Sequence, residues 1–201
     1  MGNTVIFGGT FNPIHNEHVK MIRHLSTLDF VHKILVVPTH IPPHKTVGYL
    51  ADDSDRINMC EIATQGIPKV LVSDFEIKRK GKSYTFYTVS ALKKEFPNDN
   101  FFVVCGGDMA ITLDTWYNYG ELKKICTFLV IDRPDTNPDK LKEYLENLKS
   151  DGAKIIYTFC PTKDVSSTKL REALSKGEEK ISDIPVNVAE YIRDKKLYGC
   201  E

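Results

Sequence analysis

The fold of this chain is decided by the stretch Thr4-Val5-Ile6-Phe7-Gly8-Gly9-Thr10-Phe11-Asn12-Pro13-Ile14-His15-Asn16-Glu17-His18. The apolar run from Thr4 to Phe7 is typical of a short buried strand, and two glycines follow it directly. Val19, Ile22 and Leu25 then recur at helical spacing. A strand that passes through a tight turn into a helix is the opening unit of an α/β fold.

The same alternation of strand and helix continues to the end of the chain. Short, uniformly apolar strands separated by helices favour a doubly wound parallel sheet with helices on both faces. We expect an α/β fold in one domain over residues 1–201, with a helical C-terminal portion at about 165–201. The predicted strands are 4–7, 33–37, 70–73, 101–105, 127–131 and 154–158, and the predicted helices are 15–28, 53–64, 85–96, 137–149, 167–175 and 186–197.

Composition limits the partners of the chain. Among its 201 residues, 27 Lys and Arg balance 27 Asp and Glu, so the formal net charge is zero. Proteins that bind nucleic acid or a membrane surface usually carry a basic excess, so we expect neither kind of partner. There is no apolar run of membrane-spanning length, and the N-terminus lacks the features of a secretory signal.

The cysteines indicate a reducing compartment. There are five, an odd number, they are spread widely, and no Cys-x-x-Cys pair occurs. This pattern fits a cytoplasmic protein and argues against a zinc-thiolate site.

All six histidines lie between His15 and His44, where random placement would scatter them. Two are in the glycine turn, and His40 and His44 flank two prolines in the long loop 38–52. Both segments leave the carboxyl end of a predicted strand, so they should open on the same edge of the sheet. Ligands of doubly wound folds bind at that edge, and a loop of this length is a candidate functional loop.

The glycine turn has the chemistry of an anion site. Gly8 and Gly9 let the backbone approach a ligand and expose N–H groups. The helix that follows points its positive end at the same place, and His15 and His18 share one helical face. A phosphate chain is the ligand that fits these donors.

Two other interpretations of the turn stay open. The His-x-x-His pair could bind zinc with Glu17, or the histidines could only cap backbone groups. The turn is not a Gly-x-Gly-x-x-Gly dinucleotide fingerprint. Nor is Gly81-Lys82-Ser83 a Walker A loop, because the first glycine of that motif would fall at Glu76.

Two motifs at opposite ends of the chain carry a resemblance to a known family. The glycine turn is similar to the phosphate-binding signature of the nucleotidylyltransferase superfamily, which usually ends in His-x-Gly-His. The segment Ser166-Ser167-Thr168-Lys169-Leu170-Arg171 resembles its distal Ser-Ser-Thr-x-hydrophobic-Arg motif. A simple helix cap would explain Ser166 but not Arg171. The resemblance implies a Rossmann-like sheet and a single nucleotidylyltransferase domain.

Further motifs resemble the bacterial nicotinate-nucleotide adenylyltransferases and extend the similarity over nearly the whole chain. Pantetheine-phosphate adenylyltransferases are similar only in the first and last motifs. The segments are Pro38-Thr39-His40-Ile41-Pro42-Pro43-His44-Lys45, Glu76-Ile77-Lys78-Arg79-Lys80-Gly81-Lys82-Ser83-Tyr84-Thr85 with Thr88, Gly106-Gly107-Asp108 with Leu113 and Trp116, and Tyr191-Ile192 with Leu197-Tyr198.

This resemblance implies a reaction. The phosphate of nicotinate mononucleotide attacks the α-phosphorus of ATP, and nicotinate adenine dinucleotide and pyrophosphate result. Catalysis would rest on positioning and charge stabilisation. Mg²⁺ is expected as a cofactor held mainly by ATP phosphates and water, without protein metal ligands. Two other functions stay open: an enzyme of this superfamily with another acceptor or nucleotide, and a binding protein that has lost catalysis.

The resemblance also assigns site residues. His15 and His18 would contact the triphosphate, Lys45 would reach a phosphate from its loop, and Arg171 would clamp the leaving pyrophosphate. These are the expected catalytic residues. The expected ATP-binding residues are Gly8, Gly9, Thr10, Phe11, His15, His18, Gly106, Asp108, Arg133, Ser167, Thr168 and Arg171.

The nicotinate nucleotide is assigned a second set of residues. Backbone N–H groups of Thr85 and Tyr117 would favour its carboxylate over an amide. Trp116, the only tryptophan, would stack on the pyridine ring, with simple packing as the alternative. Asp108 would hold ribose hydroxyls or cap a helix. The expected residues are Lys45, Tyr84, Thr85, Asp108, Trp116 and Tyr117.

The chain departs from the family pattern at two positions. Asn12 stands where the family often has Asp, and it keeps a hydrogen-bonding side chain. Glu17 stands where the family has a glycine that lies against the nucleotide base. Its side chain either turns aside to pair with another group or alters nucleotide binding.

Overall fold

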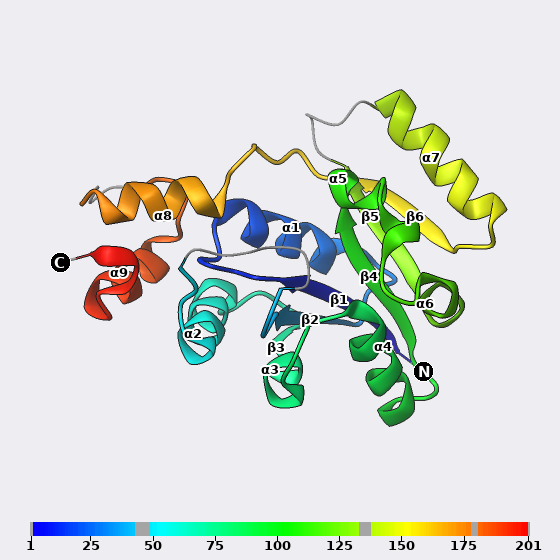
Figure 1. Ribbon diagram of the computed structural model, residues 1–201, viewed down its shortest axis with the longest axis horizontal. Helices are drawn as coiled ribbons and strands as arrows, with labels where there is room; N and C mark the ends of the chain where they lie inside the picture. The colour runs from blue at the N-terminus through cyan, green and yellow to red at the C-terminus, as the bar shows by residue number, and fades with distance from the viewer. Residues whose placement is uncertain (1, 43–48, 133–137, 178–180, 201) are drawn as a thin grey trace.

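The computed structural model describes residues 2–42, 49–132, 138–177 and 181–200. One six-stranded sheet, parallel throughout, forms its centre, in the order β3-β2-β1-β4-β5-β6 (Figure 1). The order reverses direction between β1 and β4, which is the switch point where such folds bind ligands. The strands are β1 (Asn3–Gly9), β2 (Lys33–Pro38), β3 (Val70–Val72), β4 (Asn100–Gly106), β5 (Thr127–Asp132) and β6 (Ile155–Phe159).

Helices alternate with these strands, so the expected α/β fold with a doubly wound, Rossmann-like parallel sheet is confirmed. The helix expected from 137 has its first position outside the described residues. The helices are α1 (Asn16–Thr27), α2 (Asp53–Thr64), α3 (Phe75–Arg79), α4 (Thr85–Glu95), α5 (Gly107–Ala110), α6 (Tyr119–Ile125), α7 (Pro138–Ser150), α8 (Ser167–Ser175) and α9 (Val186–Asp194), with 3-10 turns at Leu113–Thr115 and Leu197–Gly199.

Alternation of side chains along each strand supplies two cores, one on each face of the sheet. In β1, Val5 and Phe7 join a core with α1, α2, α8 and α9, whereas Ile6 joins a core with α4, α6 and α7. In β5, Leu129 and Phe128 divide between the two faces in the same way. Apolar residues on both faces explain why the strands read as continuous apolar runs.

The C-terminal helices return to the start of the chain. After β6, the linker of residues 160–166 runs back across the molecule, and α8 and α9 lie near α1 and α2, far from α7 (Figure 1). Leu170 and Leu174 of α8 are buried with Val188 and Ile192 of α9 in the core that α1 and α2 share. This packing brings the distal motif to the first turn.

The five cysteines are free thiols. Burial raises the pKa of the Cys60 and Cys105 thiols far above the ordinary value and raises that of Cys126 to about 12. In the part of the chain that the structure describes, no helix has the length and apolar character to cross a membrane.

Candidate functional site

A cleft of about 640 Å³ opens at the carboxyl ends of β1 and β4. Its walls are the turn after β1, the start of α1, the turn after β4, the β6–α8 linker and the start of α8. Lys45 and Arg133 lie outside the described residues. Every other residue expected to bind ATP lines the cleft, namely Gly8, Gly9, Thr10, Phe11, His15, His18, Gly106, Asp108, Ser167, Thr168 and Arg171.

The turn after β1 depends on a close approach at Gly9. A Cβ at this position would lie 2.8 Å from Cε1 and Cζ of Phe11. The Phe11 ring is buried and stacks on Phe7, with centroids 5.8 Å apart, and it makes a T-shaped contact with the His18 ring at 5.2 Å. Gly9 therefore lets the turn fold over the ring that supports His18.

We expect Gly9→Ala to lower the free energy of unfolding by about 1–3 kcal/mol, because the added methyl overpacks a filled site. Gly8→Ala is the matched control, since a Cβ there meets nothing within 4 Å. Its stability should stay within about 0.5 kcal/mol of the wild type. Urea denaturation measures both variants, and equal stabilities would contradict the close-packing argument.

His15 and His18 form one unit at the start of α1. Their rings are stacked with centroids 3.6 Å apart, and the backbone N–H of His15 donates to Nδ1 of His18 at 3.3 Å. Because Nδ1 accepts, the proton of a neutral His18 ring resides on Nε2, which is then a donor. His15 is the N-cap and is buried, whereas His18 is half-buried on the cleft wall. This arrangement shows the capping contacts of the two histidines and leaves the His18 side chain on the cleft wall.

The distal motif is bonded directly to the first turn. Arg171 donates from Nη1 to the Asn12 carbonyl at 2.8 Å and from Nη2 to Oγ1 of Thr168 at 3.2 Å. Ser167 Oγ donates to the Pro13 carbonyl at 3.2 Å. A guanidinium has five N–H donors, so these two contacts leave others for an anion in the cleft.

Asn12 holds three segments together beneath the cleft. Its Nδ2 donates to the Tyr49 carbonyl at 2.7 Å, and its Oδ1 accepts from the Ala51 N–H and the Tyr198 hydroxyl at 3.1 and 2.8 Å. Burial raises the pKa of Tyr198 and keeps its hydroxyl a donor. An aspartate at position 12 would place an oxygen against the Tyr49 carbonyl, so this contact explains the asparagine.

Sequence reasoning missed Arg56, which is fully buried and joins the loop after β1 to the loop after β2. Its donors reach the carbonyls of Thr10 at 2.9 Å, Thr39 at 2.6 Å and Ala51 at 3.1 Å, and the carboxylate of Asp53. A signal was present, because Arg56 shares the buried stripe of α2 with Met59, Cys60 and Ala63.

Glu17 lines the cleft and pairs with the backbone of the β6–α8 linker. Its Oε2 accepts the backbone N–H of Lys163 at 2.9 Å, and the residue is 9% exposed. The structure therefore supplies a partner for the side chain that replaces the family's glycine. Lys163, Asp164 and Val165, which sequence reasoning did not include, also line the cleft.

Of the residues expected at the nicotinate nucleotide, Asp108 lines this cleft and Lys45 is outside the described residues. The other four, Tyr84, Thr85, Trp116 and Tyr117, do not line it. The rings of Tyr84 and Tyr117 are stacked with centroids 4.5 Å apart, and the hydroxyls of Tyr87 and Tyr117 lie 2.9 Å apart. Thr85 is the first residue of α4, so its N–H has no acceptor within that helix. Trp116 is half-buried and packs edge-on against Phe128 at 6.5 Å, with packing contacts to the core.

The loop after β2 is hydrogen-bonded to Ser83, the residue that precedes Tyr84. The backbone N–H of His40 donates to Ser83 Oγ at 2.9 Å, and Ser83 N–H donates to the Ile41 carbonyl at 3.0 Å. His40 Nδ1 also lies 2.6 Å from Oδ2 of Asp53. The described start of this loop thus runs beside the segment that carries Tyr84 and Thr85.

The carboxylates of the cleft do not form a cage for a metal ion. Outside the gaps 43–48, 133–137 and 178–180, no group of three or more His, Cys, Asp or Glu is placed to hold one. Asp108 is exposed at the second position of α5, whose N-cap is Gly106, and Glu17 already binds an amide. Such a donor set fits Mg²⁺ that arrives with phosphates and keeps part of its water shell.

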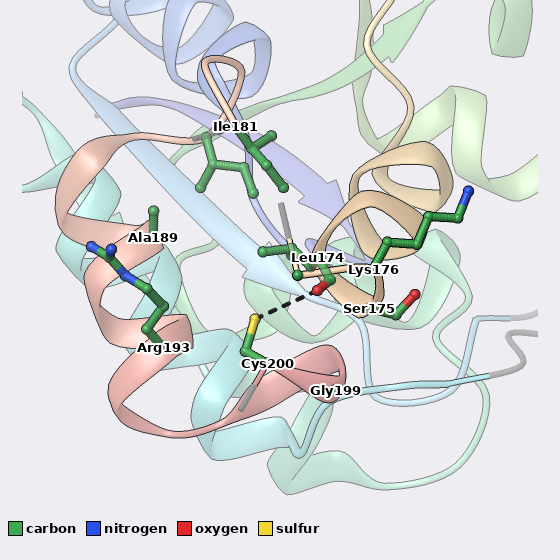
Figure 2. Close-up of a pocket in the computed structure, with 10 residues that line it drawn as sticks. Leu174, Ser175, Lys176, Ile181, Ala189, Arg193, Gly199 and Cys200 are labelled. Carbon is green, nitrogen blue, oxygen red and sulfur yellow. Dashed lines mark hydrogen bonds between the residues drawn. The ribbon is translucent and has the colours of Figure 1, made fainter. Parts of the chain in front are cut away.

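A second cavity, of about 500 Å³, lies between the ends of α8 and α9 (Figure 2). Leu174, Ile181 and Ala189 provide apolar walls, and the half-buried Cys200 thiol points toward the Leu174 carbonyl at 3.9 Å. None of the residues assigned from the sequence lines it. The described residues that were expected to bind ATP line the cleft at β1 and β4 instead.

Comparison with known proteins agrees with this geometry. Residues 6–173 match the model of the cytidylyltransferase-like family. A probable nicotinate-nucleotide adenylyltransferase of Clostridium tetani is 34% identical over 98% of this chain and 100% of its own length. The nicotinate-nucleotide adenylyltransferase of Bacillus subtilis is 33% identical over 96% of each chain.

Solved structures of low identity support the fold. The nicotinic acid mononucleotide adenylyltransferase of Plasmodium falciparum complexed with APC is 22% identical, with a TM-score of 0.82 over 100% of this chain and 99% of that one. The same protein complexed with NaAD gives a TM-score of 0.80 at 21% identity, with the same coverage. The family match and the sequence relatives show that the chain belongs to the cytidylyltransferase-like family and, within it, to the nicotinate-nucleotide adenylyltransferases.

Proposed function

We propose that this protein transfers AMP from ATP to nicotinate mononucleotide, giving nicotinate adenine dinucleotide and pyrophosphate. One observation carries the proposal: the first turn and the distal motif, far apart in sequence, line one cleft and are bonded to each other through Arg171 and Asn12. The family membership and the names of the relatives support the substrates. The free thiols support a reducing, cytoplasmic location.

The chemistry asks the protein mainly for positioning. The nucleophile is a phosphate oxygen that is already anionic, so in-line attack on the α-phosphorus requires no general base. The bond to the leaving pyrophosphate breaks as the new phosphorus–oxygen bond forms. His18 Nε2–H, with His15 stacked behind it, would donate to the triphosphate where negative charge accumulates.

Negative charge on the leaving pyrophosphate would be balanced by groups at the start of α8. Arg171 would use its remaining donors on pyrophosphate, assisted by the N–H groups of Ser167 and Thr168 at the start of α8. Lys45 and Arg133, outside the described residues, are proposed to reach further phosphate oxygens. Mg²⁺ bound to the phosphates would neutralise part of their charge. Asp108, which lines the cleft, would hold ribose hydroxyls.

Preference for the acid nucleotide is proposed to come from the backbone beside the stacked rings of Tyr84 and Tyr117. The N–H of Thr85, together with that of Tyr117, would donate to the carboxylate, whereas an amide NH₂ would oppose two donors with a donor. Stacking of Tyr84 on Tyr117 brings these two backbone segments together.

Replacing Trp116 by alanine should raise the KM for nicotinate mononucleotide at least tenfold, because the pyridine ring would lose a stacking surface worth roughly 1–3 kcal/mol. The KM for ATP should change less than about twofold. Steady-state kinetics with each substrate varied in turn measures both constants. A rise in the KM for ATP alone would place Trp116 in the ATP subsite and contradict the prediction.

Pyrophosphate release tests the proposed function. The assay combines protein, ATP and Mg²⁺ with nicotinate mononucleotide or, in parallel, nicotinamide mononucleotide. Release that strongly favours the acid is the expected result. Equal use of both would contradict the selectivity argument, and ATP binding without release with any acceptor would favour a binding protein that has lost catalysis.

A further inference from the structure

The β6–α8 linker forms one wall of the cleft without regular secondary structure of its own. Residues 160–166 lie between β6 and α8, and Lys163, Asp164, Val165 and Ser166 line the cleft. Within the linker, the Thr162 N–H donates to the Cys160 carbonyl at 2.7 Å and closes a local turn. Cys160 and Thr162 of the linker are buried, and bonds from side chains elsewhere in the chain add to this packing.

Two side chains on one face of α1 hold this wall. Glu17 Oε2 accepts the Lys163 N–H at 2.9 Å, and Lys20 Nζ, three residues further on, donates to the Pro161 carbonyl. Both contacts reach the linker backbone, so they fix its path independently of its side chains. Glu17 itself is 9% exposed and also lines the cleft, so it connects the helix that carries His18 to the opposite wall.

We propose that Glu17, assisted by Lys20, is a positioning residue that sets the width of the nucleotide cleft by anchoring the Lys163 amide. The inference rests on the proposed function for its substrate, ATP, but the anchor itself is a property of the free protein. A carboxylate that accepts an amide N–H makes a charge-assisted hydrogen bond, which is stronger than one between neutral groups. Loss of the acceptor would let the linker move and would weaken nucleotide binding.

Two measurements test the proposal. Hydrogen exchange of the Lys163 amide, without substrates, reports the anchor, and calorimetric binding of MgATP without acceptor reports the cleft. Glu17→Ala should speed exchange at Lys163 about tenfold and raise the Kd for ATP about tenfold, as expected for loss of one hydrogen bond to a charged group. Glu17→Gln retains an acceptor oxygen and should stay within about threefold of the wild type in both.

Asn16→Ala is the matched control. Asn16 lies in the same turn of α1, but its Nδ2 donates to the Ser182 carbonyl at 2.8 Å, away from the cleft. This variant should leave Lys163 exchange and ATP binding unchanged. If Glu17→Ala does not fold, Lys20→Ala tests the same wall from an exposed position and should shift both readouts in the same direction.

Three results would overturn the proposal: unchanged exchange at Lys163 in Glu17→Ala and Lys20→Ala, unchanged ATP affinity despite faster exchange, or equal impairment of Glu17→Gln and Glu17→Ala. Failure of the proposed function would look different. The wild-type protein would then transfer no AMP, while the exchange measurement, which uses no substrate, would still decide whether Glu17 anchors the linker.

Discussion

Replacing His18 by alanine is expected to lower kcat by about a hundredfold or more while the KM for ATP changes only a few-fold. The reason is the placement of its donor. His18 accepts the His15 N–H on Nδ1 and packs against the Phe11 ring, so Nε2–H has a fixed direction before substrate arrives. A preorganised donor of this kind acts most strongly on charge that develops in the transition state.

His24→Ala is the control for this prediction. His24 lies on the same helix, but its Nε2 lies 2.9 Å from Thr158 Oγ1, and it does not line the cleft. Its removal should leave kcat within about twofold of the wild type. Steady-state kinetics on the two variants gives the comparison. A near-normal kcat for His18→Ala would remove His18 from the transition state.

Replacing Arg56 by methionine should lower the free energy of unfolding by about 3 kcal/mol or more. The guanidinium is fully buried, and its loss leaves the Thr10, Thr39 and Ala51 carbonyls without this donor and Asp53 without its cationic partner. Leaving a buried acceptor without a partner lowers stability by more than an average hydrogen bond contributes to it. Because all three carbonyls belong to the loops after β1 and β2, activity should also fall.

An exposed ion pair provides the contrast for Arg56. Lys78 pairs with Asp74 at 2.9 Å, and its side chain is 76% exposed. Lys78→Met should therefore change stability by less than about 1 kcal/mol. Urea denaturation of both variants measures the difference. A stability of Arg56→Met equal to that of Lys78→Met would mean that other groups satisfy the three carbonyls.

The main architecture could be predicted from sequence because both faces of the central strands are buried. Strand residues such as Val5, Ile6 and Phe7 all enter a core, so each central strand reads as an apolar run. A long helix such as α1 shows its periodicity over several turns, through Val19, Ile22 and Leu25. The short helices α3, α5 and α6, with 5, 4 and 7 residues, were not predicted, because a pattern of period 3.6 cannot be recognised over one or two turns.

The site could be predicted only in part, for a different reason. Motif residues such as His18 and Arg171 could be identified individually, and the sheet topology then brings their segments together. The contacts that hold the site depend on tertiary packing that no local pattern records. Arg56 reaches three carbonyls in two separate loops, and Glu17 accepts the Lys163 amide N–H from 146 positions away. Neither partner set follows from the residue type.

The most direct test of the account follows the phosphorus atoms of ATP. With wild-type protein, Mg²⁺ and nicotinate mononucleotide, label in the α-phosphate should appear in nicotinate adenine dinucleotide, and label in the γ-phosphate should appear in pyrophosphate. Arg171→Ala should slow both transfers together. Release of the α-label as free AMP, or transfer of the γ-label to the acceptor, would contradict adenylyl transfer in this cleft.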